Sequence, residues 1–322
     1  MTSLLEVRNL NVSFDTDEGN LSAVRGVNFT IRKGESVALV GESGSGKSVT
    51  ALSVMSLLGK GAEMSAGKIA LSGKNLLSLS DGELRDVRGK EVGMIFQEPM
   101  SSLNPVFRIG DQIAEVLQRH LHKDRKVSLQ EAEYLLEKVG ISDPHLRAQN
   151  YPHELSGGMK QRVMIAIALA CNPDLLIADE PTTALDVTIQ AQILELLEEL
   201  RDELGMAILL ITHDLGVVAE FSERVMVMYA GEIVENCDVG NLFQEAAHPY
   251  TRALLRALPS ARSGGRLESI EGSIPSPFSY PEGCAFSQRC PEALDVCERI
   301  APPETDLLAG RKVRCWLYGG DQ

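Results

Sequence analysis

The 322-residue sequence predicts an α/β fold built on a parallel sheet that helices cover on both faces. Three short segments are almost wholly apolar and indicate buried strands, namely residues 35–40, 175–178 and 207–211. Directly after the first of them, a glycine-rich run ends in Gly-Lys-Ser, and residues 49–58 can only continue as a helix. Buried strands that alternate with helices in this way are typical of parallel sheets.

The remaining elements follow from local patterns along the chain. Alternating apolar residues over Leu5–Phe14 and Val24–Ile31 predict strands of an antiparallel edge. From about residue 100 to 160 the pattern is helical and polar, which predicts a helical subdomain. Apolar residues at spacings of 4, 3 and 4 predict an amphipathic helix (Ile193, Leu197, Leu200 and Leu204). Gly205 is expected to end this helix.

The composition changes near residue 259, which predicts a domain boundary. Residues 259–281 are dense in Pro, Ser and Gly, as linkers are, and a cysteine-bearing tail follows them. The sequence therefore predicts a main domain over residues 1–258 and a small C-terminal cysteine-rich extension over residues 259–322.

Charge and hydropathy exclude several function classes. The net charge of −14 leaves no excess of Lys or Arg to neutralise phosphates, so nucleic acid is not an expected partner. The same charge disfavours adsorption to an anionic membrane face. The sequence has no apolar run near the about 18 residues that a membrane-spanning helix needs, and its start lacks the pattern of a signal peptide. We expect a cytoplasmic chain whose membrane association comes through a protein partner.

The glycine-rich run has the pattern of a phosphate-binding loop. It reads G-x-x-x-x-G-K-S and comprises Gly41, Glu42, Ser43, Gly44, Ser45, Gly46, Lys47 and Ser48. Its glycines let backbone N–H groups turn toward phosphates, and the helix that follows adds the positive end of its dipole. Lys47 would reach the β- and γ-phosphates, and the Ser48 hydroxyl would bind Mg²⁺. The sequence therefore predicts a nucleoside triphosphate site, with a chance match in a Gly/Ser-rich turn as the alternative.

Two further motifs match this chemistry. Asp179 and Glu180 end an apolar strand at the carboxyl edge, where parallel sheets place their ligands. One carboxylate there can hold Mg²⁺ and the other can polarise an attacking water. A solvated strand end is the alternative. Ser156-Gly157-Gly158 precedes a helical run and predicts a second anion site at a helix N-terminus.

Together these motifs resemble those of the ATP-binding subunit of ABC transporters, over residues 1 to about 255. The matching segments are the Walker A loop (Gly41–Ser48), the Walker B strand (Leu175–Asp179), the catalytic glutamate (Glu180), the Q-loop glutamine (Gln97), the signature motif (Ser156-Gly157-Gly158), the D-loop (Ala184-Leu185-Asp186), the switch histidine (His213) and the adenine-stacking aromatic residue (Phe14). The alternative for Phe14 is a core position in its strand, and for His213 a capping or core position. Met159 departs from the family pattern, which has Gln there.

The resemblance implies a head-to-tail dimer of ATPase domains. Each nucleotide would lie between Lys47 of one domain and the Ser-Gly-Gly motif of the other. Transition-state charge on the γ-phosphate would be met by Lys47, Mg²⁺ and His213. The Mg²⁺ ligands that the resemblance implies are Ser48, Gln97 and Asp179, and Asp186 joins the ATP-binding residues.

Three longer stretches resemble the dipeptide and oligopeptide importers in particular, namely residues 97–105, 151–159 and 248–251. Such subunits pair with two transmembrane permease subunits, a second ABC ATPase subunit and an extracytoplasmic substrate-binding protein, at the cytoplasmic face of the plasma (inner) membrane. The expected function is ATP hydrolysis that powers the import of di- and oligopeptides. Import of nickel, opines or glutathione by the same machinery is the main alternative. A DNA-repair ATPase and an iron–sulfur sensor protein are more distant ones.

Four of the six cysteines lie in the extension: Cys284, Cys290, Cys297 and Cys315. Their spacing lacks the C-x2-C pair typical of structural zinc, whereas iron–sulfur sites accept wider spacings. The resemblance implies a [4Fe–4S] cluster that these four thiolates hold, and Zn²⁺ or no metal are the alternatives. Without a metal, the extension is expected to have little apolar material to fold around.

Overall fold

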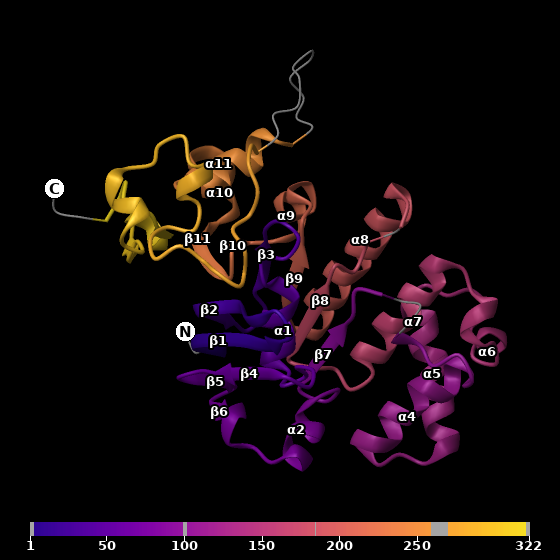
Figure 1. Ribbon diagram of the computed structural model, residues 1–322. Helices are drawn as coiled ribbons and strands as arrows, with labels where there is room; N and C mark the ends of the chain where they lie inside the picture. Colours follow the sequence, from indigo (N-terminus) through magenta and orange to yellow (C-terminus); the bar gives the residue numbers. More distant parts are fainter. Residues whose placement is uncertain (1–2, 99–101, 184, 259–269, 320–322) are drawn as a thin grey trace. The chain divides into compact units, whose positions relative to one another are not determined.

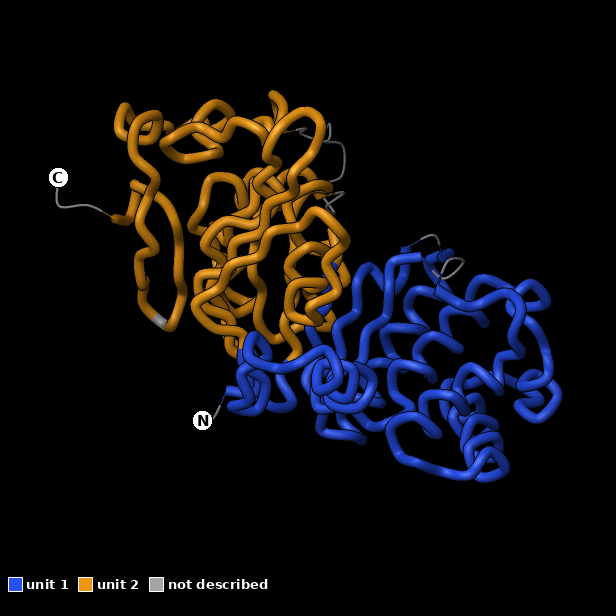
Figure 2. Tube along the Cα trace, turned by 60° about the horizontal axis from the view of Figure 1, so that its bottom comes forward, with its two compact units in different colours: residues 1–5, 31–35, 70–211 blue, residues 6–30, 36–69, 212–322 orange. Residues whose placement is uncertain are grey.

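The computed structural model describes residues 3–98, 102–183, 185–258 and 270–319. The chain forms two compact units, blue and orange in Figure 2. The first unit comprises residues 1–5, 31–35 and 70–211, and the second unit comprises residues 6–30, 36–69 and 212–322.

Strands and helices follow one another along most of the chain (Figure 1). The strands are β1 (Ser3–Thr16), β2 (Gly19–Arg32), β3 (Ser36–Val40), β4 (Ala62–Ser65), β5 (Lys68–Leu71), β6 (Lys74–Asn75), β7 (Val92–Ile95), β8 (Leu175–Asp179), β9 (Ala207–Thr212), β10 (Arg224–Tyr229), β11 (Glu232–Asp238), β12 (Glu304–Asp306) and β13 (Lys312–Arg314). The α-helices are α1 (Lys47–Val54), α2 (Asp81–Val87), α4 (Ile109–Leu121), α5 (Arg125–Lys138), α6 (Pro144–Arg147), α7 (Gly157–Leu169), α8 (Val187–Leu204), α9 (Leu215–Phe221), α10 (Val239–Glu245) and α11 (Pro249–Arg256). Within the described residues, none of the helices combines the length and the apolar character needed to cross a membrane.

The first unit contains three parallel strands, with β8 between β7 and β9. Leu175 at the start of β8 lies opposite Val92 on one side and Ala207 on the other. All residues of β8 and β9 are buried. The two apolar segments predicted as strands here are confirmed, because strands covered on both faces need apolar side chains throughout.

A group of helices follows β7 in the first unit, drawn in magenta in Figure 1. Helix α4 packs against α5, and both contact α7. Each buries one face: α4 buries Ile113 and Leu117, and α5 buries Ala132 and Leu136. A spacing of four residues places both members of a pair on the same side of a helix. The described residues between 102 and 160 form helices and turns and no strand, and residues 99–101, which belong to a predicted motif, lie outside the described residues.

The second unit carries a sheet in the order β3, β10, β11, β13, β12. Strands β3 and β10 are parallel, and the other pairs are antiparallel. Strand β3 is buried at every position, as predicted, and α9 and α10 pack on the sheet. The last two strands come from the C-terminal extension, so the extension continues this sheet.

The predicted antiparallel edge strands are present in β1 and β2. Strand β1 also pairs with β4, where Phe14 lies opposite Ala62. Strands β4 to β7 escaped prediction because segments of two to four residues are too short to show a period.

The helix after the glycine-rich loop is shorter than predicted. Helix α1 ends at Val54, whereas the pattern predicts a helix to residue 58. Ser56 has a left-handed backbone with φ of 50°, which is incompatible with a continuing helix. At the end of α8, by contrast, Gly205 has φ of 65° and stops the helix as predicted.

The C-terminal extension, yellow in Figure 1, packs on the apolar core of the second unit. Ala285 and Phe286 are buried in one cluster with Tyr229 and Tyr250. Val313 of β13 is buried as well. The expectation that the extension lacks apolar material to fold around is therefore wrong for residues 270–319. Residues 259–269 of the predicted linker lie outside the described residues.

Candidate functional site

The predicted phosphate-binding loop connects β3 to α1 in the second unit. Gly41 has φ of 154° and Gly46 has φ of 104°, values that L side chains rarely adopt. A Cβ on Gly41 would lie 2.1 Å from the carbonyl oxygen of Met228, and one on Gly46 would lie 2.5 Å from that of Ala23. Backbone atoms cannot give way as a flexible side chain does, so only glycine fits. The loop is therefore held close against β10 and β2.

Lys47, the first residue of α1, folds back into the loop. Its ammonium donates hydrogen bonds to the carbonyl oxygens of Gly41 (2.9 Å) and Glu42 (3.0 Å), and the residue is 6% exposed. The Ser45 hydroxyl of the same loop is buried and has no hydrogen-bond partner among the described residues. A buried cation, such a hydroxyl and the N–H groups at the start of α1 together fit a polyphosphate.

Glu42 connects the loop to two other parts of the second unit. Its backbone N–H donates to the Tyr250 hydroxyl at 2.9 Å. Its carboxylate accepts two hydrogen bonds from the Arg289 guanidinium, at 2.9 and 3.2 Å. Tyr250 lies in the 248–251 stretch that the sequence singles out. Arg289 directly precedes Cys290 of the extension, and its contact with Glu42 was not predicted from the sequence.

An aromatic cluster holds Tyr250 against the extension. The Tyr250 ring centre lies 4.6 Å from that of Tyr229 and 5.4 Å from that of Phe286. Burial raises the pKa of the Tyr250 hydroxyl, so it stays protonated at neutral pH. His248 caps α11 by accepting the Tyr250 N–H at Nδ1, at 3.0 Å. Burial lowers the pKa of His248 to about 3, so its imidazole is neutral.

In the first unit, Glu180 follows β8 in a strained conformation. Its φ is 47°, a left-handed value that is uncommon outside glycine and recurs at functional sites. Its N–H donates to the Ile211 carbonyl oxygen at 2.9 Å, which fixes the backbone there. Its carboxylate accepts hydrogen bonds from Gln97 Nε2 (3.0 Å) and Thr183 Oγ1 (2.8 Å). The structure thus brings together Glu180 and Gln97, two predicted site residues that are 83 positions apart in the chain.

Two aspartates lie near Glu180 in the sequence and differ in their surroundings. Asp179 is the last residue of β8 and is buried. Asp186 is exposed and caps α8, because its Oδ1 accepts the Ile189 N–H at 3.0 Å. Ala184, which precedes them in the predicted D-loop match with Leu185 and Asp186, lies outside the described residues.

The Ser-Gly-Gly motif stands at the start of α7, as predicted. Ser156 is the N-cap, and its Oγ accepts the Met159 N–H at 3.4 Å. Ser156 and Gly157 are exposed. A Cβ on Gly158 would lie 3.1 Å from the Ile189 side chain of α8, so glycine allows the N-termini of α7 and α8 to approach closely.

His213 and Phe14 belong to the second unit. His213 is exposed, and the N-cap of α9 is Asp214, whose carboxylate accepts the Gly216 N–H at 2.8 Å. His213 is therefore neither a core nor a capping histidine. Phe14 is half-buried on β1, so its ring is not enclosed in the core.

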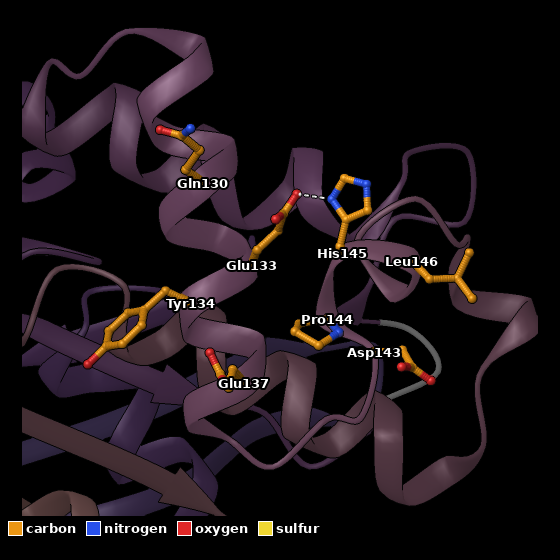
Figure 3. Close-up of a pocket in the computed structure, with 8 residues that line it drawn as sticks. All are labelled: Gln130, Glu133, Tyr134, Glu137, Asp143, Pro144, His145 and Leu146. Atoms are coloured by element: carbon orange, nitrogen blue, oxygen red, sulfur yellow. Dashed lines mark hydrogen bonds and ion pairs between the residues drawn. The ribbon is translucent and has the colours of Figure 1, made fainter.

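A groove of about 770 Å³ lies along α5 and α6 in the first unit (Figure 3). Its lining residues are Gln130, Glu133, Tyr134, Glu137, Asp143, Pro144, His145 and Leu146. Tyr134 and Leu146 are 59% and 58% exposed, large values for such apolar side chains. Three of the lining residues are carboxylates, and Glu133 pairs with His145 at 2.9 Å. The groove therefore combines apolar contact area with negative charge.

The four cysteines of the extension lie near one another in the second unit. Burial, followed by the charges that Cys297, Cys315 and Cys290 would carry, raises the pKa of the Cys284 thiol to about 12. Nevertheless, no three His, Cys, Asp or Glu side chains among the described residues are arranged as a ligand set for a metal ion. The donor atoms suit an iron–sulfur cluster, but their arrangement does not match a bound one. The predicted [4Fe–4S] cluster and the Zn²⁺ alternative gain no support here.

The comparisons with known sequences point to one family. Residues 24–183 match the family model described as ABC transporter, and residues 234–297 match that of the oligopeptide/dipeptide transporter C-terminal region. The oligopeptide transport ATP-binding protein AppD of Bacillus subtilis is 53% identical over 320 residues, covering 99% of this chain and 98% of that protein. The dipeptide transport ATP-binding protein DppD of the same organism is 50% identical and covers 98% and 95%.

Solved structures share the fold. A dimeric ATP-binding cassette in a post-hydrolysis state, bound to ADP and phosphate, matches with a TM-score of 0.66 at 29% identity, over 73% of this chain and 98% of that one. A dimeric bacterial ABC transporter cassette also gives 0.66, at 30% identity and the same coverage. The fold is the α/β fold of P-loop ABC ATPases. The chain belongs to the family of ATP-binding proteins of oligopeptide and dipeptide ABC transporters.

Proposed function

We propose that this chain is the ATPase subunit of an ABC importer and hydrolyses MgATP to power the uptake of di- and oligopeptides. The observation that carries the proposal is the Glu180 carboxylate, which stands at a strand end and is oriented by Gln97 and Thr183. A residue that polarises an attacking water must be fixed in this manner. The names of the relatives, oligopeptide and dipeptide transport proteins, favour peptides over nickel, opines or glutathione.

The individual roles follow from the resemblance and from the chemistry of each side chain. Catalysis of phosphoryl transfer to water rests on positioning and charge stabilisation, for which backbone N–H groups, cations and one base suffice. In our proposal the loop Gly41–Ser48, with Lys47, binds the phosphates, and the adenine stacks on Phe14. Ser48, Asp179 and Gln97 bind Mg²⁺. Glu180 polarises the attacking water, and His213 stabilises the charge on the γ-phosphate.

A second ABC ATPase subunit completes each catalytic site in this proposal. Ser156 and Gly157 are exposed at a helix N-terminus. A surface that contacts a nucleotide held by another subunit has to be accessible in this way. Asp186 is exposed as well. Two of the similar solved structures are described as dimers. The partner is a second copy of the chain or a related subunit.

The transmembrane permeases are proposed to dock at the groove along α5 and α6. Its exposed Tyr134 and Leu146 offer apolar contacts, and its carboxylates favour a segment that carries basic residues. Docking there would hold the chain at the cytoplasmic face of the plasma membrane as a peripheral subunit. The extracytoplasmic substrate-binding protein would meet the permeases on the other side.

The extension over residues 259–322 is proposed as an appendage of the ATPase domain over residues 1–258, with a [4Fe–4S] cluster on its four cysteines. The proposal rests on the family resemblance and on the four thiols, which are the ligand type that such clusters bind. When bound, such a cluster would join the segments that carry Cys284, Cys290, Cys297 and Cys315. A structural Zn²⁺ is the alternative occupant.

The transport proposal is tested with the chain alone and in proteoliposomes that contain the permeases and the second ATPase. Hydrolysis of MgATP should be slow for the isolated chain and faster in the assembly, which should import a labelled dipeptide when the binding protein is present. Gln97→Ala should uncouple hydrolysis from uptake. Full turnover by a monomer at high dilution, or peptide uptake without ATP, would contradict the proposal.

The cluster is tested by iron and acid-labile sulfide analysis of protein purified without air. About four of each per chain are expected for a [4Fe–4S] site. Cys297→Ser should lose most of the iron, and Cys237→Ser, which changes a buried cysteine outside the extension, should keep it. Stoichiometric zinc without sulfide decides for the zinc alternative, and metal-free protein with an ordered extension rules out both.

A further inference from the structure

The C-terminal extension contacts the phosphate-binding loop directly through one ion pair. Arg289 Nη1 and Nη2 donate to the two carboxylate oxygens of Glu42 at 2.9 and 3.2 Å, the parallel geometry of a bidentate pair. The Arg289 side chain is 5% exposed and that of Glu42 is 26% exposed. Such a pair is partly shielded from solvent, so removal of one partner is more costly than at a fully exposed ion pair.

Arg289 is itself fixed by two groups of the extension and one of β10. Its Nε donates to the Glu271 carbonyl oxygen at 3.1 Å, and its Nη2 donates to that of Ile270 at 3.3 Å. The Tyr229 hydroxyl accepts a further hydrogen bond at 3.3 Å. The guanidinium is therefore held in place before any ligand arrives, and its position depends on how the extension folds around residues 270 and 271.

Glu42 places a negative charge in a loop whose task is to bind anions. A carboxylate there repels the phosphates of a nucleotide unless a cation neutralises it. Lys47 contacts the backbone carbonyl of Glu42, whereas Arg289 contacts the carboxylate. The charge of Arg289 thus compensates that of Glu42.

Glu42 also anchors the backbone that orients Lys47. The Glu42 N–H donates to Tyr250 and its carbonyl oxygen accepts from Lys47, so a displacement of Glu42 moves both of the peptide units that flank its Cα. Arg289 holds the side chain of this residue from a third direction. Loss of that contact would disturb the loop geometry as well as its charge.

We propose that Arg289 is a positioning residue of the nucleotide site, which neutralises Glu42 and fixes the phosphate-binding loop, so that the fold of the C-terminal extension sets the affinity for Mg-nucleotide. The proposal rests on the nucleotide-binding function proposed above and adds a means of regulation to it. Any partner or condition that displaces the segment around Arg289 would weaken nucleotide binding without touching a motif residue.

The test measures the equilibrium Kd of the full-length chain for MgADP, which is not turned over. Arg289→Met keeps the apolar stem and removes the charge, and it should raise Kd about tenfold, the value of one charge-assisted hydrogen bond. Glu42→Gln alone should leave Kd within about twofold, because the repelling charge disappears together with the need for its partner. The double variant Glu42→Gln with Arg289→Met should recover most of the lost affinity.

Recovery in the double variant separates compensation of charge from a merely structural role, which would leave the double variant as weak as Arg289→Met or weaker. The defect of Arg289→Met should also shrink at high salt, where repulsion is screened. The control is Arg252→Met, because Arg252 forms a bidentate but more exposed pair with Glu292, at 3.0 and 3.2 Å. Its Kd should equal that of the wild type.

Each outcome is informative. Wild-type binding of MgADP with an unchanged Kd in Arg289→Met overturns the inference and leaves the proposed function intact. Failure of the wild type to bind MgADP overturns the proposed function itself. Should Arg289→Met not fold, Arg289→Lys, which keeps the charge and loses the bidentate geometry, replaces it. A Kd of that variant near the wild-type value supports neutralisation, and a Kd about tenfold higher, although the charge is kept, overturns it.

Discussion

The two glycine-rich loops of the molecule, Gly41–Ser48 and Ser156–Gly158, have similar sequences and different surroundings. Both stand at the N-terminus of a helix, α1 for the first and α7 for the second. The first is pressed against backbone carbonyls and is held through Glu42 by Tyr250 and Arg289. The second is exposed, and its serine caps its own helix.

This difference indicates that the two loops have separate roles. A loop that must hold a polyphosphate before its partner arrives has to be organised in advance, because the ordering cost then falls on folding and not on binding. A surface that completes the site needs only to present N–H groups and to stay accessible. The first loop is therefore expected to determine affinity, and the second to determine turnover in the assembly.

The largest effect is expected from a substitution that leaves both loops intact and removes the proposed base. Glu180→Gln should reduce phosphate release by the assembled transporter about a thousandfold, within the range that a positioned proton acceptor contributes. Nucleotide affinity should stay near that of the wild type, because neither loop changes. Thr183→Ala, which removes one hydrogen bond to Glu180, is the milder companion variant. Near-normal hydrolysis by Glu180→Gln would assign the base to another residue.

Removal of the cation from the first loop should have the next largest effect. Lys47→Ala is expected to raise the Kd for MgATP about a hundredfold, because charge-assisted hydrogen bonds to phosphate are lost. Equilibrium binding of the isolated chain measures this directly. Lys60→Ala, which changes an exposed lysine after α1, should bind as the wild type does. A Lys47→Ala affinity within a few-fold of the wild type would refute the assignment of the loop.

Low pH is expected to reduce the free energy of unfolding through His248, which caps the helix that carries Tyr250. The pKa of His248 in the folded chain, about 3, lies below the ordinary histidine value of about 6.5, so between these values the unfolded chain binds a proton that the folded chain does not. The free energy of unfolding should thus fall as the pH is lowered, by about 2 kcal/mol between pH 6.5 and 5.

Denaturant unfolding over this pH range tests the prediction. His248→Asn keeps an N-cap side chain without a titratable ring, so it should lack this part of the pH dependence. His145→Asn alters an exposed histidine of the first unit and should retain it. An unchanged slope in His248→Asn would show that other groups cause the pH dependence.

The smallest effect is expected at the second loop. Ser156→Ala should lower turnover in the assembled transporter about fivefold, the worth of one neutral hydrogen bond to phosphate. The Kd of the isolated chain for MgATP should not change, because the loop acts on a nucleotide held by another subunit. A weakened Kd in the isolated chain would mean that both loops bind the same nucleotide within one chain.

The core of the fold could be predicted because its central strands are apolar at all positions but one each. Strands β3, β8 and β9 are buried throughout, and few other structures accommodate such segments between helices. The start of α7 and the end of α8 could also be predicted, because a serine cap and a left-handed glycine are local signals in the sequence. The packing of the extension could not be predicted, because its buried residues, such as Phe286 and Val313, are scattered among turns without a period.

The candidate site was predictable where spacing carries the information and hidden where it does not. Lys47 and Glu180 belong to motifs of fixed spacing, which locate them in the sequence. Arg289 lies 247 residues from Glu42, and no pattern in the sequence indicates that these two side chains pair. Such a partnership arises only from the tertiary fold, which brings the extension to the loop.

Strands β12 and β13 have a consequence for the behaviour of the protein in concentrated solution. Strand β13 pairs with Glu235 and Asn236 of β11, and β12 pairs with β13 on its other side. An open strand edge offers its backbone groups to other chains and promotes aggregation. Here the last strand of the sheet is three residues long and carries Glu304 and Asp306, features that discourage such pairing. A protein shortened to residues 1–258 would expose β11 and is expected to precipitate more readily than the full chain.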